Sequence, residues 1–176
     1  DKAYTDKIIN KQEAYNNKSV SFYEIAKIKM KSDISGAINL IEKALTLKKN
    51  FPPYIKLYLT ILFSINDKKK IQKILKKYWN EIPSPLLRRS ITDVLKENKI
   101  NDINFVKNFI YKNSNDEESK KLLIDFAIYF NEWTLARENI KGLIGQNTSK
   151  EMCLFRSARA LGEFNDIKKS TRWKLS

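Results

Sequence analysis

Equivalent positions recur along this chain at an interval of about 34 residues, and this repeat constrains the fold more than any other feature. The marker positions are 34, 34, 31 and 34 residues apart by subtraction: Ala37, Ile71, Phe105, Ala136 and Ser170. Around them, apolar residues follow one another at steps of three and four, which is the period of an amphipathic helix. A unit of this length cannot bury its apolar face alone, so the repeat predicts helix pairs that stack side by side.

Turn residues separate the predicted helices at matching places. The dipeptide Asn-Asp occurs at 66–67, 101–102 and 165–166, and Asn131-Glu132 is a variant of it. Asn tolerates the left-handed conformation that ends a helix, and Asp caps the next helix by accepting from its free N–H groups. Asp33 is expected to cap a helix in the same way. These regular turns predict several helix–turn–helix units of one kind.

Prolines mark the boundaries between the predicted units, because proline stops one helix and can begin the next. They stand at Pro52-Pro53 and at Pro83-Ser84-Pro85. Helices are expected over 20–31 and 34–48 in the first unit and over 86–98 and 103–112 in the third. A fifth unit would begin at Thr148 and end with Trp173. Hydrophobic residues make up 42% of the chain, which supplies a sizeable core.

The fold class that follows is all-α. A period near 34 residues is typical of tetratricopeptide repeats (TPRs). We therefore predict a TPR-like right-handed superhelix of antiparallel helix pairs, with four to five pairs over residues 19–176. Residues 1–18 are predicted to form a separate N-terminal helix, the remnant of a preceding unit.

The inward faces of the predicted units can be aligned on the repeat. In unit one they are Ile25 and Ile28, followed by Ala37, Ile41 and Ala44; in unit two, Leu59 and Leu62, followed by Ile71, Leu75 and Tyr78. In unit four, three residues of the first helix (Leu123, Ile124 and Ala127) are expected to pack against three of the second (Ala136, Ile140 and Leu143).

Several segments resemble one known family, the HemY-type proteins, in their C-terminal TPR region. They are Ser32-Asp33 through Ala44, Asn50 to Pro53, Trp79 to Leu86, Glu132 to Arg137, and Asn165-Asp166 leading to Arg172-Trp173. Ser84 departs from the pattern, since that family often has His between its two prolines. The resemblance implies a bacterial inner-membrane protein that is anchored through N-terminal spans and associated with a late step of haem biosynthesis.

What this resemblance implies for the present chain is a soluble fragment from the cytoplasmic face of the inner membrane. Its partner would be a protein or peptide, and a haem-pathway enzyme is the candidate that the family suggests. No signal peptide and no apolar run long enough to span a bilayer is present in the sequence, because a span takes about 20 residues.

The residue types that usually carry catalysis are scarce. The chain has no histidine and one cysteine, Cys153, which lies among apolar residues and is expected to be a buried thiol. There is no Gly-rich phosphate loop and no recognisable nucleophile motif. We therefore expect a non-catalytic chain with no cofactor and no metal site. Direct haem binding by this segment is an alternative that titration with haem would test.

A groove for a partner is expected on the first helices of the units, where aromatic and cationic residues mix. The candidates are Phe22, Tyr23, Lys29, Lys56, Thr60, Phe63, Lys121, Asp125, Tyr129, Arg156 and Arg159. Such a surface would suit an acidic or amphipathic peptide. Each of these residues could instead belong to a solvated face or to a contact between units.

The formal net charge is +14, which favours anionic partners. Lysine-rich composition is also what drift in an AT-rich genome produces. The best anion-binding cluster combines Arg156 and Arg159 with Lys168, Lys169, Arg172 and Lys174, and it would suit anionic lipid. Arg88-Arg89 is interpreted as a solvated helix start. The alternative function is a basic α-solenoid that binds nucleic acid or an anionic membrane surface.

Overall fold

The computed structural model describes residues 10–141 and residue 143. Over this part the chain is all-α, as predicted, and contains no strand. The helices are α2 (Lys11–Lys29), α3 (Ile34–Leu47), α4 (Pro52–Ser64), α5 (Lys68–Glu81), α6 (Pro85–Glu97), α7 (Ile103–Ile110), α8 (Glu117–Tyr129) and α9 (Trp133–Lys141), with the short 3-10 helix η1 (Tyr111–Asn113) after α7. None of the described helices has both the length and the apolar character needed to cross a bilayer.

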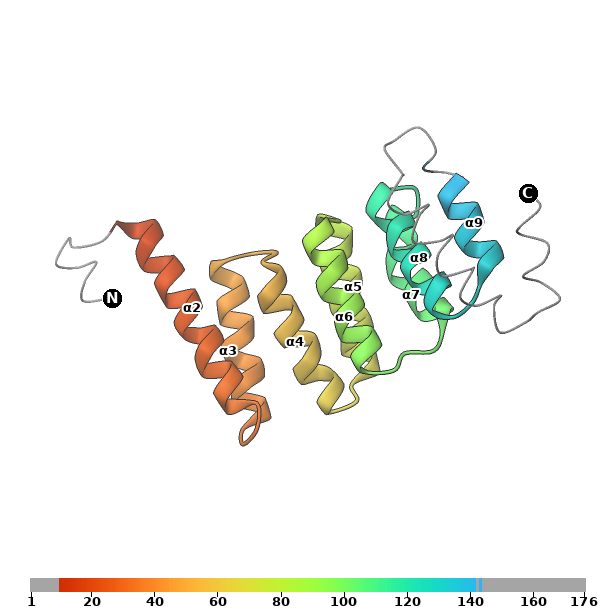
Figure 1. Cartoon of the computed structure of the whole chain (residues 1–176). Helices are drawn as coiled ribbons and strands as arrows, with labels where there is room; N and C mark the ends of the chain where they lie inside the picture. The colour runs from red at the N-terminus through yellow and green to blue at the C-terminus, as the bar shows by residue number, and fades with distance from the viewer. Residues whose placement is uncertain (1–9, 142, 144–176) are drawn as a thin grey trace.

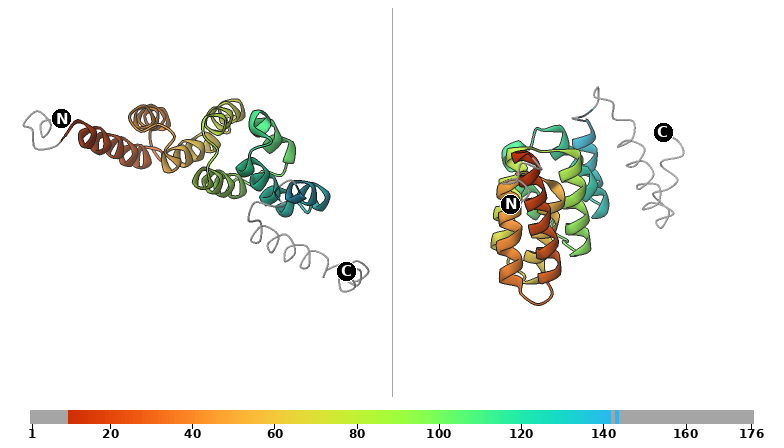
Figure 2. Two further views of the ribbon diagram at one scale, coloured as in Figure 1. Left: turned by 90° about the horizontal axis from the view of Figure 1, so that it is seen from above. Right: turned by 90° about the vertical axis from the view of Figure 1, so that its left-hand side faces the viewer.

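The helices stand side by side in an elongated row that runs from α2 to α9 (Figure 1). Seen from above, the row has two staggered layers (Figure 2). One layer holds α2, α4, α6 and α8, and the other holds α3, α5 and α7. Helix α4 packs on α6 and α6 packs on α8, while α5 packs on α7. We call these the even layer and the odd layer.

Short turns join the helices, and the caps of α3, α5 and α7 are those that the sequence predicted. Asp33, Asp67 and Asp102 each accept a backbone hydrogen bond at the start of α3, α5 and α7. Asp116 does the same for α8. A side-chain cap satisfies a backbone N–H that has no partner inside the helix, and so fixes where the helix begins.

Four described residues other than glycine have a left-handed backbone conformation. Three of them follow the ends of helices, and the fourth lies in the turn between α3 and α4. Asn66 and Asn131 have positive φ angles of 54° and 60°, as the turn pattern predicted, and Asn50 has 55°. The prediction for Asn101 was wrong, since the left-handed residue of that turn is Lys99, with φ at 51°. Helix α6 ends four residues before Asn101, at Glu97, so the reversal of the chain falls before that position.

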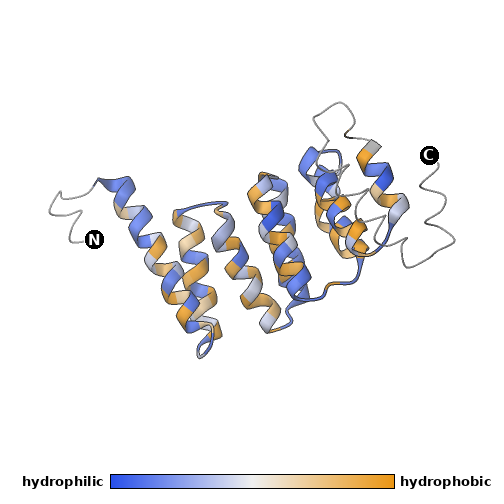
Figure 3. Ribbon diagram, in the orientation of Figure 1, coloured by the Kyte–Doolittle hydropathy of each residue, from blue (hydrophilic) through white to orange (hydrophobic). Residues whose placement is uncertain are grey.

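One apolar core runs through the row. It connects Ala26 of α2 with Phe126 of α8, and a smaller cluster of Ile124, Ala127, Ala136, Ile140 and Leu143 joins α8 to α9. Figure 3 shows both hydrophilic and hydrophobic stretches along the helices, as expected for helices with one buried side. The inward residues predicted for unit two are all buried. Leu123 was predicted to face α9 but belongs to the larger cluster.

The predicted inward face of the first helix was wrong. Ile25 and Ile28 are 43% and 74% exposed, whereas Ala14, Ser19 and Ala26 are the buried residues of α2. Helix α2 stands at the end of the described row and packs mainly on α3. An end helix is covered on one side only, and here the small residues face that side.

Helix α2 also runs without a break through residues 17–20, where the sequence was expected to divide. Asn10 caps its start by accepting a hydrogen bond from the N–H of Glu13. No proline or glycine stands between residues 1 and 31, so nothing in the covalent chain interrupts the helix. Residues 1–9 lie outside the described residues.

Candidate functional site

Two of the predicted groove residues on the even layer form ion pairs between neighbouring units. Lys56 of α4 lies 3.0 Å from Asp93 of α6. Asp125 of α8 lies 2.5 Å from Arg88 of α6. Both pairs join residues 37 positions apart, so they repeat one contact along the row. These charges hold successive helices of the even layer together.

Arg88 was interpreted from the sequence as part of a solvated helix start, and this was wrong. Its guanidinium also bonds Glu118 at 2.9 Å and is largely covered. Burial disfavours the charged form, but the nearby carboxylates of Asp125 and Glu118 outweigh it and raise the pKa of Arg88. Arg89, the next residue, is exposed as expected.

Lys29 and Lys121, two more predicted groove cations, have acidic neighbours within their own segment. Lys29 lies 3.0 Å from Asp33, and Lys121 lies 2.6 Å from Glu117 of the same helix. Thr60 donates its hydroxyl to the carbonyl of Lys56 in its own helix. Local contacts of this kind stabilise a helix or a turn and bring no partner-binding group together.

Most of the aromatic residues predicted for the groove pack against other residues, and one of them is exposed. Tyr23 stacks on Tyr54 with ring centroids 5.0 Å apart, and Phe22 and Phe63 pack against the core. Tyr129 is 45% exposed and lies beside Lys96. The structure therefore does not gather these residues into one aromatic surface.

The remaining predicted site residues lie outside the described residues. They are Arg156 and Arg159 of the groove, and Lys168, Lys169, Arg172 and Lys174 of the anion cluster, together with Cys153 and Trp173. Among residues 10–141 and 143, no group of three or more His, Cys, Asp or Glu side chains is arranged to hold a metal ion.

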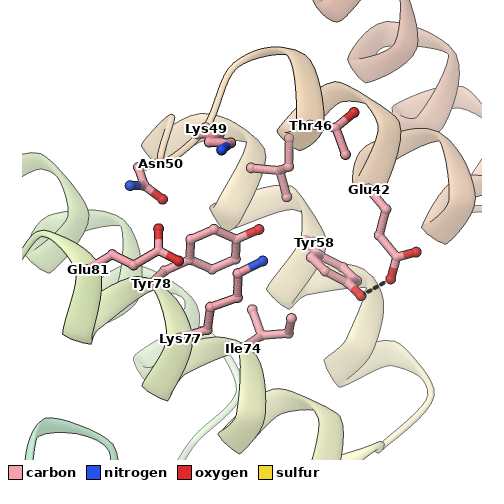
Figure 4. Close-up of a pocket in the computed structure, with 10 residues that line it drawn as sticks. Glu42, Thr46, Lys49, Asn50, Tyr58, Ile74, Lys77, Tyr78 and Glu81 are labelled. Carbon is pink, nitrogen blue, oxygen red and sulfur yellow. Dashed lines mark hydrogen bonds between the residues drawn. The ribbon is translucent and has the colours of Figure 1, made fainter.

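A pocket that the sequence did not predict lies among α3, α4 and α5 (Figure 4). Its volume is about 460 Å³, within the range of pockets that hold small molecules or peptide side chains. Its lining combines polar and apolar residues, including Glu42 and Thr46 from α3, Lys49 and Asn50 from the following turn, Tyr58 from α4, and Ile74, Lys77, Tyr78 and Glu81 from α5. We call it the α3–α5 pocket.

One end of the α3–α5 pocket is fixed by a tyrosine–carboxylate contact. The hydroxyl of Tyr58 donates a short hydrogen bond to Glu42. Lys70 lies 3.3 Å from the same carboxylate and 5.6 Å from the Tyr58 ring centroid. Burial and the hydrogen bond to Glu42 raise the pKa of the Tyr58 phenol. Glu42 is therefore already occupied by two partners from this protein.

The other end of the pocket offers hydrogen-bond acceptors. Oδ1 of Asn50 is buried and has no hydrogen-bond partner within the described part of the chain. Glu81 is exposed and forms no ion pair with any described residue. Beside Glu81 in Figure 4 lies the ring of Tyr78, whose pKa is raised to about 12 by burial and by the charges of Glu81 and Glu42. Acceptors of this kind favour a ligand that donates hydrogen bonds.

The sequence carried no direct signal for this pocket. Tyr78 of α5 stands 34 residues after Ala44 of α3, so a large polar ring and a methyl group occupy equivalent positions of neighbouring units. Both were predicted to be core residues. Tyr78 lines the pocket and Ala44 does not, so this difference in size along the repeat does not locate the pocket.

A second pocket, of about 490 Å³, lies where the turns after α4 and α6 meet α5 and α7. Phe63, Ile100 and Phe105 line it together with Asn66 and Lys68. Phe63 is the only predicted groove residue among the lining residues of either described pocket.

Comparisons with protein-family models, with curated proteins and with solved structures find no match to this chain.

Proposed function

We propose that this chain is a non-catalytic, TPR-like scaffold that holds a segment of a protein partner in the α3–α5 pocket. The 34-residue repeat, the capped turns and the two helix layers support a right-handed superhelix of helix pairs. Such stacks commonly present binding surfaces to peptides, and the pocket is large enough to hold a peptide side chain.

The observation that carries the proposal is the pair of unused acceptors beside Tyr78. Leaving the buried Oδ1 of Asn50 unpaired costs free energy, which a ligand donor would recover. Glu81 is the last residue of α5, where a negative charge opposes the helix dipole. Both features are unfavourable for the free chain and favourable for a cationic ligand.

A lysine or arginine side chain of the partner is the proposed occupant of this end of the pocket, which Asn50 and Glu81 line together with Lys49 and Lys77. Its N–H groups would bond Asn50 and Glu81, and its stem would lie against Tyr78. The acidic peptide expected on the even layer has less support, because Lys56 and Lys121 already have carboxylate partners there. An acidic peptide would have to displace them.

The resemblance to HemY-type proteins suggests which partner the chain has in the cell and where it acts. On that basis the partner is an enzyme of haem biosynthesis, and the chain acts at the cytoplasmic face of a bacterial inner membrane. Isolating the full-length protein from membranes, with its partners identified by mass spectrometry, tests this wider role separately from the pocket.

The pocket itself is tested with an array of random peptides and the purified chain. We expect bound peptides to be enriched in one Arg or Lys flanked by apolar residues. The Asn50→Gly variant keeps the left-handed backbone but removes the acceptor, and we expect it to weaken the best peptide about tenfold, equivalent to about 1.4 kcal/mol. Glu81→Gln should weaken it by at least as much.

Asn131→Gly is the matched control, because Asn131 has the same left-handed conformation at a turn away from the pocket. It should leave peptide affinity unchanged. Enrichment of acidic peptides, or equal effects of the two asparagine substitutions, would contradict the proposed seat.

A further inference from the structure

Lysines crowd on α5 more densely than on any other described helix. Six of the ten residues from 68 to 77 are lysines, and Glu81 is the only acidic residue in the helix. Lys70 pairs with Glu42 and Lys77 lies over the ring of Tyr78. The other four are exposed and form no ion pair with a described residue: Lys68, Lys69, Lys73 and Lys76. We call these four the lysine stripe.

The lysine stripe lies on the solvent side of α5. Lys69, Lys73 and Lys76 follow one another at steps of four and three, so they share one face of the helix. The opposite side of α5 carries Ile71 and Leu75, both fully buried. Packing therefore fixes which way the stripe faces.

Neighbouring parts of the odd layer extend this positive charge. Lys43 and Lys49 are exposed on α3 and its following turn, and Lys107 and Lys112 are exposed on α7 and η1. Glu42, the acidic residue of α3, already pairs with Lys70. Like charges repel one another, so unpaired lysines on one surface raise the free energy of the chain. An anionic partner, or screening by salt, removes this repulsion.

The even layer differs in this respect. Two of its cations, Lys56 and Arg88, pair with carboxylates of the same layer, Asp93 and Asp125. Exposed cations such as Lys27 and Arg89 also occur on the even layer, but they stand singly, whereas the lysines of α5 follow one another along one helix.

We propose that the lysine stripe binds the phosphate backbone of a nucleic acid. Lys68 and Lys76 are eight residues apart, about 12 Å along the helix axis at 1.5 Å per residue. A double-stranded nucleic acid carries one charge per about 1.7 Å of its axis, so several phosphates lie within this length. Lysine ammonium groups, which act as point charges without fixed geometry, suit such sequence-independent contacts.

An acidic peptide matches the stripe less well. An extended chain rises about 3.3 Å per residue and turns alternate side chains away, so only about two carboxylates could face the helix over 12 Å. The density of the four lysines therefore favours a nucleic acid. This inference goes beyond the proposed peptide seat, and it uses none of the pocket's acceptors.

The test measures the affinity of the full chain for a 20-base-pair duplex and for a single strand of the same length, over a range of salt concentrations. The variant Lys69→Gln/Lys73→Gln/Lys76→Gln removes three charges from the stripe. The matched control Lys27→Gln/Lys31→Gln/Arg89→Gln removes three exposed charges elsewhere. Circular dichroism should show that both variants keep the helical content of the parent.

We expect the stripe variant to reduce the slope of log affinity against log salt by about 2.7 on the duplex, since each phosphate contact contributes about 0.9. The control should reduce it by less than about one such contact. The substitutions Lys69→Arg/Lys73→Arg/Lys76→Arg should preserve binding, because the charge is kept.

Three results would overturn the inference. In the first, both triple variants weaken binding equally, which would assign it to net charge alone. In the second, polyglutamate or vesicles rich in anionic lipid bind more tightly than either nucleic acid and depend on the same lysines. In the third, the parent chain binds neither nucleic acid at low salt.

Discussion

The indole nitrogen of Trp79 lies 2.7 Å from the hydroxyl oxygen of Ser119, and both residues are fully buried although 40 positions separate them. The hydrogen bond joins α5 of the odd layer to α8 of the even layer. The amide of Asn113 adds to this junction by donating to the carbonyl of Trp79 at 3.1 Å. Trp79 thus connects segments that no single repeat contains.

Ser119→Ala should destabilise the chain, because it leaves the indole N–H of Trp79 buried without a partner. The expected loss in free energy of unfolding is about 1–3 kcal/mol. Urea denaturation followed by circular dichroism measures it. Ser21→Ala, at an exposed position of α2, is the control and should change stability by less than about 0.5 kcal/mol. Equal losses for the two variants would show that the Trp79 contact contributes nothing specific.

Arg88→Ala should be more harmful than Arg89→Ala, although the two arginines are adjacent. Removing Arg88 takes away a cation that bonds two partly covered carboxylates, Glu118 and Asp125. We expect a loss of about 1–3 kcal/mol for Arg88→Ala and under about 0.5 kcal/mol for Arg89→Ala. Lowering the pH to protonate the two carboxylates should reduce the difference. A difference that stays constant with pH would argue against the ion pairs as its cause.

Alkaline pH should destabilise the chain through Tyr78. The phenol of an unfolded chain has its ordinary pKa near 10, whereas burial raises the pKa of Tyr78 to about 12 in the folded chain. The folded state therefore holds the proton more tightly, and the stabilisation is complete below pH 10 and is lost as the pH rises through 12. Absorbance of tyrosinate should show late titration by both Tyr58 and Tyr78, and the amplitude near pH 12 should fall in Tyr78→Phe and persist in Tyr111→Phe.

Lys99→Gly should stabilise the turn between α6 and α7. Lys99 has a φ angle of 51°, a conformation that costs a residue with a side chain about 1–2 kcal/mol and costs glycine almost nothing. After the greater entropy of glycine in the unfolded chain is subtracted, we expect a gain of about 0.5–1 kcal/mol. Lys96→Gly, inside the last turn of α6, should instead destabilise by about 1 kcal/mol. Thermal unfolding of both variants separates these outcomes.

Local features of this fold could be predicted from the sequence, because each depends on a few adjacent residues. Asp33, Asp67 and Asp102 cap the helices that follow them, and Asn66 and Asn131 adopt the left-handed conformation. The apolar period also identified the buried face of α4 and α5 correctly. In these places local preference and tertiary packing agree.

Features that depend on how helices are placed could not be predicted in the same way. Lys56 was taken as a groove cation because nothing in the sequence reveals that Asp93, 37 residues later, stands opposite it. Ile25 and Ile28 were placed inward because their spacing suits a core, yet α2 at the end of the row is covered on its small-residue side. The α3–α5 pocket likewise arises from the separation of two helices and not from any motif.

The lysine stripe concentrates positive charge on one side of α5. A strongly charged object in solution attracts such a molecule and also rotates it. Both effects act within the distance that salt screening allows. The side of α5 that carries the stripe would therefore turn toward a polyanion before any atom touched it, and the buried face of α5 would decide which side of the molecule arrives first.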